Sequence, residues 1–262
     1  MGKLDGKVAI VTGGGRGIGR AIAEGYVQEG CHVVVTATRE REEIDSFASV
    51  WGGDRALALL ADVTDYRVCE TVISETLSRF GRIDVLVNNA GRGMKYVSPT
   101  FMTEPARFWE IAPETWRMVI DTNVNGPFFM ARAVVPHLMR QKKGAIINVT
   151  MNYETMKRRG FSPYGPSKAA LESETIIWSQ DLEGTGITVN EILPGSATET
   201  GMIPSDIPAD IRARLLKPEI IVPVAVFLAS DEGRRVTGRR LIATEWSPEK
   251  ADGVLASKGI GA

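Results

Sequence analysis

Cysteine and histidine are scarce in this chain of 262 residues. It has two cysteines, Cys31 and Cys69, and two histidines, His32 and His137. The cysteines form no C-x-x-C pair, so neither a zinc site nor a disulfide framework is expected. Neither histidine stands in a sequence context typical of catalysis. These features argue against Ser-His-Asp catalysis and against a metal site.

Long apolar runs and an excess of one charge are also missing. No apolar run approaches the ~20 residues that span a bilayer. The 31 basic and 32 acidic residues leave a net charge of −1 without a basic block, so we expect neither a membrane protein nor one whose main partner is nucleic acid. A strand is predicted within a few residues of the start, which leaves no room for a secretory leader. We therefore expect a cytoplasmic globular protein.

A glycine-rich turn lies between the first predicted strand and the first predicted helix. The strand is the β-branched run 7–12, and apolar residues then recur at helical spacing up to Gly30. Between them stands Thr12-Gly13-x-x-x-Gly17-x-Gly19, a wider spacing than G-x-G-x-x-G. Strand, turn and helix in this order direct free backbone N–H groups and the positive helix end at one point. The pattern predicts a pyrophosphate site; the alternative is a flexible turn.

Strands and helices alternate along the rest of the chain. Short apolar runs predict further strands at 33–35, 56–60, 85–87, 145–149, 187–193 and 240–244. Helical spacing predicts helices at 68–80, 166–182 and 220–228. Such alternation is typical of an α/β fold with a doubly wound parallel sheet, in which ligands bind at the carboxyl ends of the strands. We see no linker or repeat, so residues 1–262 are expected to form a single domain.

Tyr164 and Lys168 place a phenol and an ammonium four residues apart. On a helix, positions i and i+4 share a face, so the two groups would converge. A free phenol has a pKa of about 10, and a neighbouring cation lowers that pKa. The pair is therefore a candidate general acid/base for an alcohol or carbonyl. The alternative is an ordinary pair on a solvated helix face.

Six motifs occur in the order found in short-chain dehydrogenases/reductases. They are Thr12-Gly13-x-x-x-Gly17-x-Gly19, Asp62-Val63, Asn88-Asn89-Ala90-Gly91, Asn123-Val124-Asn125-Gly126, Tyr164-x-x-x-Lys168 and Pro194-Gly195. From Gly6 to about Thr244 the chain resembles this family, and within it the 3-oxoacyl-carrier-protein reductase and gluconate dehydrogenase type. The resemblance implies a Rossmann-like sheet of about seven strands, hydride transfer between a nicotinamide and a carbonyl or alcohol, and a homotetramer or homodimer.

The resemblance also implies a role for each matching residue. Tyr164 would exchange a proton with the substrate oxygen, Lys168 would bind the nicotinamide ribose and lower the phenol pKa, and Asn123 would hold a water behind Lys168. For Asp62 an adenine contact and a helix cap are equally open. The expected cofactor-binding residues, besides Tyr164 and Lys168, are Gly13, Gly15, Arg16, Gly17, Ile18, Gly19, Thr38, Arg39, Asp62, Val63, Asn89, Ala90, Gly91, Pro194 and Gly195.

The family's serine, thirteen residues before the tyrosine, is replaced by Met151. A thioether donates no hydrogen bond to a developing alkoxide. Thr150 and Asn152 carry suitable groups, and we expect Asn152 to take the role because it lies beyond the regular strand. The alternative is a nucleotide-binding protein of the same fold with little or no turnover, acting as a sensor or structural subunit. Tyr164 and Lys168 favour an enzyme, because a pure binder needs no phenol.

The substrate and the cofactor are predicted less directly. Segments 92–112 and 196–216 are candidate lids over a small-molecule carbonyl or alcohol that the sequence does not name, although the first could equally form a subunit contact. NAD-selective sites carry a carboxylate at the end of the second strand, where this chain has Ala37. Arg16 and Arg39 could bind a 2′-phosphate. The sequence therefore predicts that the protein uses NADP(H) rather than NAD(H). The alternative is that both arginines are ordinary surface residues that bind no phosphate.

Overall fold

A computed structural model of the chain describes residues 2–251 and 253. Within these residues, seven strands form one sheet in the order β3-β2-β1-β4-β5-β6-β7, and every neighbouring pair is parallel. The strands are β1 (Val8–Val11), β2 (His32–Ala37), β3 (Ala56–Leu60), β4 (Val85–Asn88), β5 (Gly144–Val149), β6 (Ile187–Leu193) and β7 (Arg240–Ile242). The predicted α/β class with a doubly wound parallel sheet is confirmed.

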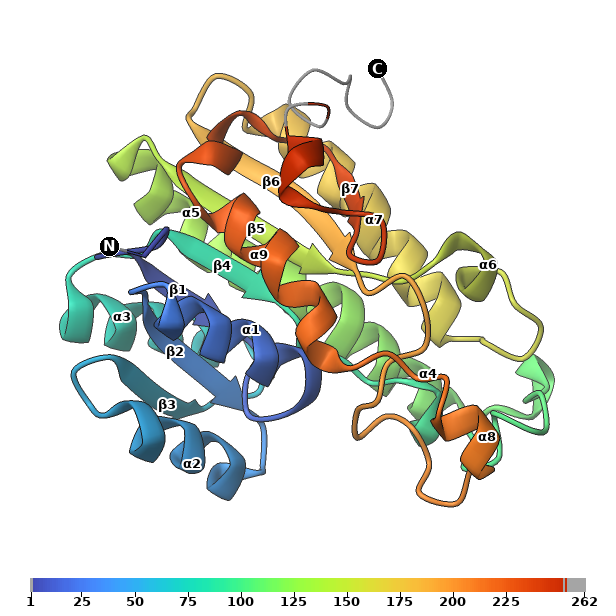
Figure 1. Cartoon of the computed structure of the whole chain (residues 1–262). Helices are drawn as coiled ribbons and strands as arrows, with labels where there is room; N and C mark the ends of the chain where they lie inside the picture. Colours follow the sequence, from blue (N-terminus) through green and yellow to red (C-terminus); the bar gives the residue numbers. More distant parts are fainter. Residues whose placement is uncertain (1, 252, 254–262) are drawn as a thin grey trace.

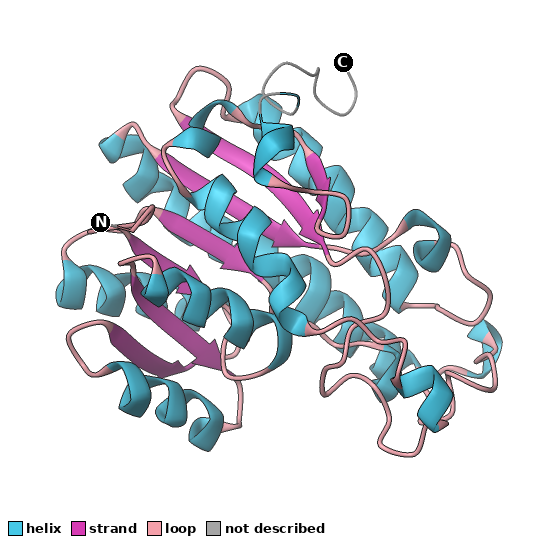
Figure 2. Cartoon of the chain, in the orientation of Figure 1, coloured by secondary structure: helices cyan, strands magenta, loops and turns pink. Residues whose placement is uncertain are grey.

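Helices cover both faces of this sheet (Figures 1 and 2). One face carries α1 (Gly17–Gln28), α2 (Arg41–Trp51) and α9 (Val222–Ala229), and the other carries α3 (Tyr66–Phe80), α5 (Gly126–Gln141) and α7 (Tyr164–Asp181). Shorter α-helices are α4 (Pro113–Ile120), α6 (Tyr153–Met156) and α8 (Ala209–Arg212), and single helical turns lie at Met94–Tyr96, Phe108–Glu110, Pro218–Ile221, Glu232–Arg235 and Pro248–Lys250. No helix of the described residues is long and apolar enough to cross a membrane.

The sheet separates two apolar cores because successive strand residues point to opposite faces. Ala9 and Val11 of β1 pack with the first helix layer, whereas Ile10 packs with the second. Both faces are covered, so β1 and β6 are buried at every position. This explains why their sequences are continuous apolar runs rather than alternating ones.

Three local features differ from the sequence-based expectations. The last strand is shorter than predicted and ends at Ile242, where the chain turns and Glu245 N donates to the Ile242 carbonyl at 3.0 Å. The helix predicted at 220–228 is a 3₁₀ turn followed by α9. Asp62 does not cap α3, because Asp65 does so by accepting from the backbone N–H groups of the first turn.

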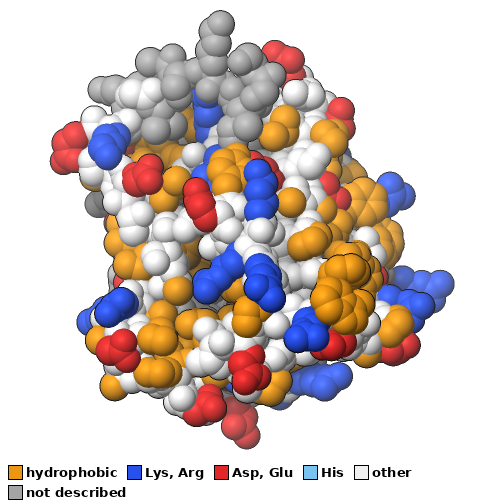
Figure 3. Space-filling view, turned by 90° about the vertical axis from the view of Figure 1, so that its right-hand side faces the viewer, with side chains coloured by type: hydrophobic (Ala, Val, Ile, Leu, Met, Phe, Trp, Pro, Cys, Tyr) orange, Lys and Arg blue, Asp and Glu red, His pale blue; other side chains and the backbone are white. Residues whose placement is uncertain are grey.

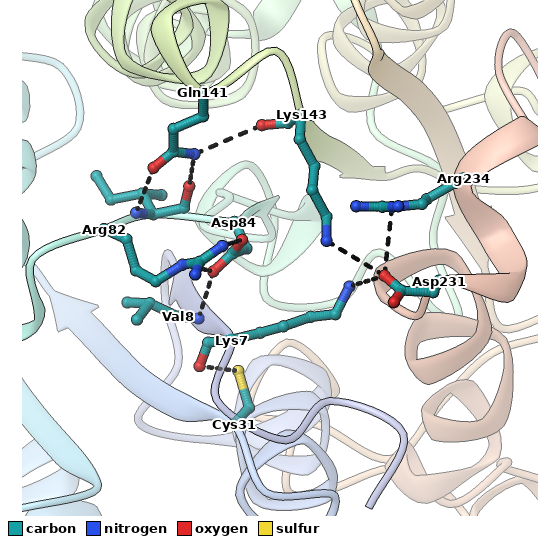
Figure 4. Close-up of polar contacts among 10 residues, drawn as sticks. Lys7, Val8, Cys31, Arg82, Asp84, Gln141, Lys143, Asp231 and Arg234 are labelled. Atoms are coloured by element: carbon teal, nitrogen blue, oxygen red, sulfur yellow. Dashed lines mark hydrogen bonds and ion pairs between the residues drawn. The ribbon is translucent and has the colours of Figure 1, made fainter.

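Polar side chains form ion pairs and hydrogen bonds at the amino ends of the strands (Figure 4). The buried carboxylate of Asp84 lies 2.6 Å from an Arg82 guanidinium nitrogen. Asp231 accepts from Lys7 Nζ at 2.8 Å and from Lys143 Nζ at 3.3 Å. These contacts, above all the hydrogen bond from Lys7, lower the pKa of Asp231 to about 2. The network lies at the sheet edge opposite the carboxyl ends, which leaves the latter open for a ligand.

Candidate active site

A cavity of about 440 Å³ opens at the carboxyl edge of the sheet. Its lining includes Gly13 after β1, Ala37 at the end of β2, Asn89 after β4, Val149 at the end of β5 and Pro194 after β6. These positions surround the point where the strand order reverses between β1 and β4. In open parallel sheets, ligands bind at such a point.

The glycine turn is held in an open shape at the start of α1. Gly13 and Gly17 have positive φ values of 63° and 54°, which side chains rarely adopt. A Cβ on Gly19 would lie 2.3 Å from the Gly13 carbonyl oxygen, so no side chain fits there. The Asn89 amide donates to the carbonyls of Thr12 and Gly13 at 2.9 and 3.0 Å. The turn therefore forms a cradle that directs the first N–H groups of α1 towards the cavity.

Tyr164 and Lys168 lie in the first turns of α7, on its cavity side, as their spacing predicted. Lys168 Nζ lies 5.9 Å from the Tyr164 ring centroid and donates to the Val149 carbonyl at 2.7 Å. Burial lowers the pKa of Lys168 to about 8, opposed by nearby Glu191. Burial raises the pKa of the Tyr164 phenol to about 12. The expected lowering of the phenol pKa by Lys168 is thus wrong for this structure, because desolvation of the phenol dominates.

Asn123 is fully buried in a π-helical segment, Asp121–Asn125, that joins α4 to α5. Its Oδ1 accepts from Arg92 N at 2.7 Å, and its Nδ2 donates to Arg92 O at 3.0 Å and to Ser167 Oγ at 2.9 Å. The wider π turn brings this amide between the loop after β4 and the helix residue beside Lys168. Asn123 therefore fixes the position of α7 relative to that loop.

Met151 lies in the cavity wall just after β5, together with Thr150 and Asn152. The Thr150 hydroxyl is buried, with no hydrogen-bond partner among the described residues. Asn152 is half-buried, N-caps α6 in an extended conformation and donates from Nδ2 to the Gly195 carbonyl at 2.7 Å. That bond uses one of the two amide protons, and the second is available to a ligand.

A buried cluster of polar side chains that the sequence did not predict lies beside this segment. Glu191 on β6 is fully buried, and its Oε1 lies 3.1 Å from Arg240 Nε on β7. Arg240 stacks on the Tyr153 ring, and the Tyr153 hydroxyl donates to the largely buried Glu172 of α7. A signal was present, because Glu191 is a charged residue within an otherwise uncharged predicted strand, and such a residue needs a partner.

The two segments predicted as lids contact each other beside the cavity. Lys95 Nζ donates to the Gly201 carbonyl at 3.2 Å, and a Cβ on Gly93 would lie 2.7 Å from Met202 Sδ. Phe108 and Trp109 of the first segment are exposed by 70% and 66%. Figure 3, which views the side where α6 and α8 lie in Figure 1, shows hydrophobic side chains among Lys and Arg side chains.

Most of the predicted cofactor-binding residues line the cavity. The lining includes Gly13, Gly15, Arg16, Gly17, Ile18, Thr38, Asn89, Ala90, Gly91, Tyr164, Lys168, Pro194 and Gly195. Gly19 packs behind the turn against Gly13, and Val63 packs in the core against Gly126. Asp62 accepts hydrogen bonds from Thr64.

The two arginines predicted to bind a 2′-phosphate have different surroundings. Arg16 lines the cavity and pairs with Glu43 at 3.2 Å. Arg39 is exposed and is not among the residues that line the cavity in the described part of the chain. Glu40 and Glu43 are also among the residues that line the cavity. Residues 2–251 and 253 contain no group of three or more His, Cys, Asp or Glu that could hold a metal ion.

A glycine cradle and a Tyr-Lys pair line the same cavity at the carboxyl edge of a Rossmann-like sheet, an arrangement suited to a dinucleotide. A family model for short chain dehydrogenases matches residues 7–209. The 3-oxoacyl-[acyl-carrier-protein] reductase FabG of Thermotoga maritima is 34% identical over 251 residues, which cover 90% of this chain and 96% of the relative. FabG of Escherichia coli is 34% identical over 245 residues, which cover 91% and 96%.

A solved structure agrees with these relatives. The crystal structure of a 3-ketoacyl-(acyl-carrier-protein) reductase from Brucella melitensis complexed with NADH matches with a TM-score of 0.81 at 29% identity, covering 91% of this chain and 97% of that one. The chain therefore belongs to the short-chain dehydrogenase/reductase family, as its six motifs predicted.

The buried Glu191 should make stability depend on pH. Burial, aided by Glu172, raises its pKa to about 8 from an ordinary 4.5, although Arg240 opposes the rise. The folded state then binds more protons than the unfolded state between these values, so the free energy of unfolding falls as pH rises through the window. Glu191→Gln should remove this component, at most about 1.4 kcal/mol per pH unit. Urea unfolding from pH 5 to 8 measures it, and an unchanged slope would contradict the assignment.

Proposed function

We propose that this protein transfers a hydride between NADP(H) and a carbonyl or secondary alcohol substrate. The observation that carries the proposal is the placement of Tyr164 and Lys168 in the same cavity as the glycine cradle. The cradle fits a dinucleotide, because a Cβ at Gly19 would clash with Gly13 and the helix N-terminus faces the opening. The nicotinamide, when bound, supplies or accepts the hydride.

In this proposal the chain's own residues handle the proton. Tyr164 donates from its hydroxyl to the carbonyl oxygen during reduction and takes the proton back during oxidation. Burial keeps the phenol protonated at neutral pH, which suits the donor role. Lys168, next to the Val149 carbonyl, is placed to bind the nicotinamide ribose. Asn123 acts through Arg92 and Ser167, which hold the loop and the helix that flank Lys168.

We further propose that Asn152 replaces the missing serine. Its Nδ2 is oriented by the Gly195 carbonyl and keeps one proton for the substrate oxygen. Thr150 is less suited, because its hydroxyl is buried, whereas Asn152 is only half-buried. A substrate with an apolar portion fits the methionines and aromatic residues of the wall, which include Met94, Phe101, Phe161 and Met202. The contacts between segments 92–112 and 196–216 support their role as lids.

A protein that binds the nucleotide but turns over slowly is the second candidate, and Met151 favours it. Relatives named 3-oxoacyl-[acyl-carrier-protein] reductase support the catalytic reading and suggest a 3-oxoacyl type of substrate.

A homodimer or homotetramer is also proposed. The exposed Phe128 of α5 and Ile177 of α7 support it, and light scattering measures the oligomeric state. A cytoplasmic location stays a prediction.

Tyr164→Phe tests the acid/base role. Removal of the hydroxyl should lower kcat at least about 10²-fold, while the dissociation constant of the nucleotide changes little because only the proton donor is lost. Steady-state kinetics over a panel of ketones and alcohols, with nucleotide fluorescence titration, provide both values. Lys168→Ala is the matched comparison and should damage both. A Tyr164→Phe enzyme with most of the wild-type rate would rule out the proposed mechanism.

The nucleotide preference can be tested at the arginines. We expect NADPH to bind more tightly than NADH, because Ala37 offers no carboxylate to the ribose and because Arg16, which lines the cavity, and Arg39, an exposed residue two positions after Ala37, supply positive charge for a 2′-phosphate. Arg39→Asp should reduce the preference. Glu43→Gln should increase it, because Arg16 is then released from its ion pair. Equal or tighter binding of NADH by the wild type would refute the preference.

The role of Asn152 separates the enzyme from the slow binder. Asn152→Ala should lower kcat by about 10²–10³-fold, the typical cost of a lost oxyanion donor, with nucleotide affinity retained. Thr150→Val is the control and should keep most of the rate. If instead the wild type is nearly inert and Met151→Ser raises its turnover, no residue has replaced the serine. A protein that binds NADPH and stays inert after Met151→Ser would support the non-catalytic candidate.

A further inference from the structure

The segment that carries Met151 and Asn152 leaves the sheet with little backbone support. β5 ends at Val149, and the last sheet-like hydrogen bond runs from Thr150 N to the Ile192 carbonyl at 2.9 Å. Asn152 already adopts an extended conformation at the start of α6. Other contacts must therefore hold the residues between them.

Arg240 supplies one of these contacts from the far end of the sheet. One of its terminal guanidinium nitrogens donates to the Met151 carbonyl at 3.0 Å. Its guanidinium carbon lies 4.0 Å from the centroid of the Tyr153 ring, close enough for a strong cation–π contact. A single side chain of β7 thus contacts the residues on either side of Asn152.

Arg240 is itself fixed by a buried partner. Its side chain is 10% exposed, and its Nε lies 3.1 Å from Oε1 of the fully buried Glu191. The two residues are directly paired in the β6–β7 register. Glu191 is the acidic side chain in contact with this buried guanidinium, and it therefore limits where Arg240 can lie.

A further link connects the segment with the catalytic helix. The Tyr153 hydroxyl donates to Glu172, which lies one helical turn after Lys168 on α7. Strands β6 and β7 and helix α7 lie side by side in Figure 1. The segment 151–153 is therefore clamped between the end of the sheet and the helix that carries Tyr164.

We propose that Arg240, oriented by Glu191, is a positioning residue that holds the Met151 carbonyl and so aims the Asn152 amide at the substrate oxygen. The proposal rests on the proposed role of Asn152 and deepens it. The guanidinium fork is required, because it must contact Glu191 and the Met151 carbonyl at the same time. In this chain the contact between Glu191 and Arg240 determines a loop geometry in which an amide, rather than a hydroxyl at position 151, faces the substrate.

The test removes the pair as a unit. Glu191→Leu/Arg240→Leu eliminates both buried polar side chains of the contact, and such replacements usually leave a protein folded. We expect kcat to fall about 10-fold or more, because a small misplacement of a positioned group has a large effect on rate, while the dissociation constant of NADPH changes by less than about 2-fold. Arg240→Lys should also lower kcat, since one ammonium cannot make both contacts.

A double-mutant cycle separates positioning from plain stability. If Arg240 acts through Asn152, the double leucine variant made in an Asn152→Ala background should lose less than about 2-fold further in kcat. Full additivity of the two losses would overturn the proposal. So would a double leucine variant with wild-type kcat.

A readout without activity follows the segment directly. In protein labelled at the methionine methyl groups, the Met151 resonance, assigned by Met151→Leu, should shift or broaden in the double leucine variant. Arg82→Leu is the matched control, because it breaks an ion pair with the buried Asp84 at the opposite edge of the sheet. It should lower stability and leave both kcat and the Met151 resonance unchanged.

The two proposals fail in different ways. An unmoved Met151 resonance in the double leucine variant overturns the positioning role, whatever the activity. A wild-type rate in Tyr164→Phe overturns the proposed function, whereas loss of kcat with a shifted Met151 resonance still supports the positioning role.

Discussion

The site depends on the hydrogen bonds with which Asn89 holds the Thr12–Gly13 turn. β1 and β4 are neighbours in the sheet although 73 residues lie between the end of β1 and the start of β4. After β1 the chain continues to β2 and after β4 to β5, so the two carboxyl ends lead into opposite halves of the sheet. The amide and the backbone N–H of Asn89 bridge this point, and the Ala90 N–H joins them by donating to Thr12 Oγ1 at 3.0 Å. These hydrogen bonds fix the position of the turn and, through it, the start of α1.

Desolvation governs the chemistry around α7. Burial raises the pKa of Tyr164 and lowers that of Lys168, so both shifts favour the neutral form of the group. The same burial raises the pKa of Glu191, although Arg240 lies in contact with it. The pKa values of these three groups are thus shifted by the same cause, which is their desolvation between the sheet and α7.

The sequence predicted the fold and most of the cavity wall because those features depend on local pattern. Apolar runs define strands and helical spacing defines helices, and glycines mark the turn that only they can form. Of the two alternatives left open for Asp62, the helix cap is wrong, because Asp65, three residues later, caps α3. Asp62 and Asp65 are equally plausible N-caps by sequence, and only the backbone conformation of the folded chain decides which of them caps the helix.

By itself the sequence determined the family, the α/β class, the glycine cradle and the Tyr-Lys pair, because each can be recognised from short motifs or from the spacing of apolar residues along the chain. Only the tertiary structure brought Arg240 of β7 to the Met151 carbonyl and to Glu191, residues 89 and 49 positions away. The pKa shifts of Tyr164 and Lys168 were likewise decided by the tertiary structure, because they follow from burial and not from the spacing of the two residues. The physical reason is that side-chain neighbours across a sheet and the exclusion of water are decided by how the whole chain packs.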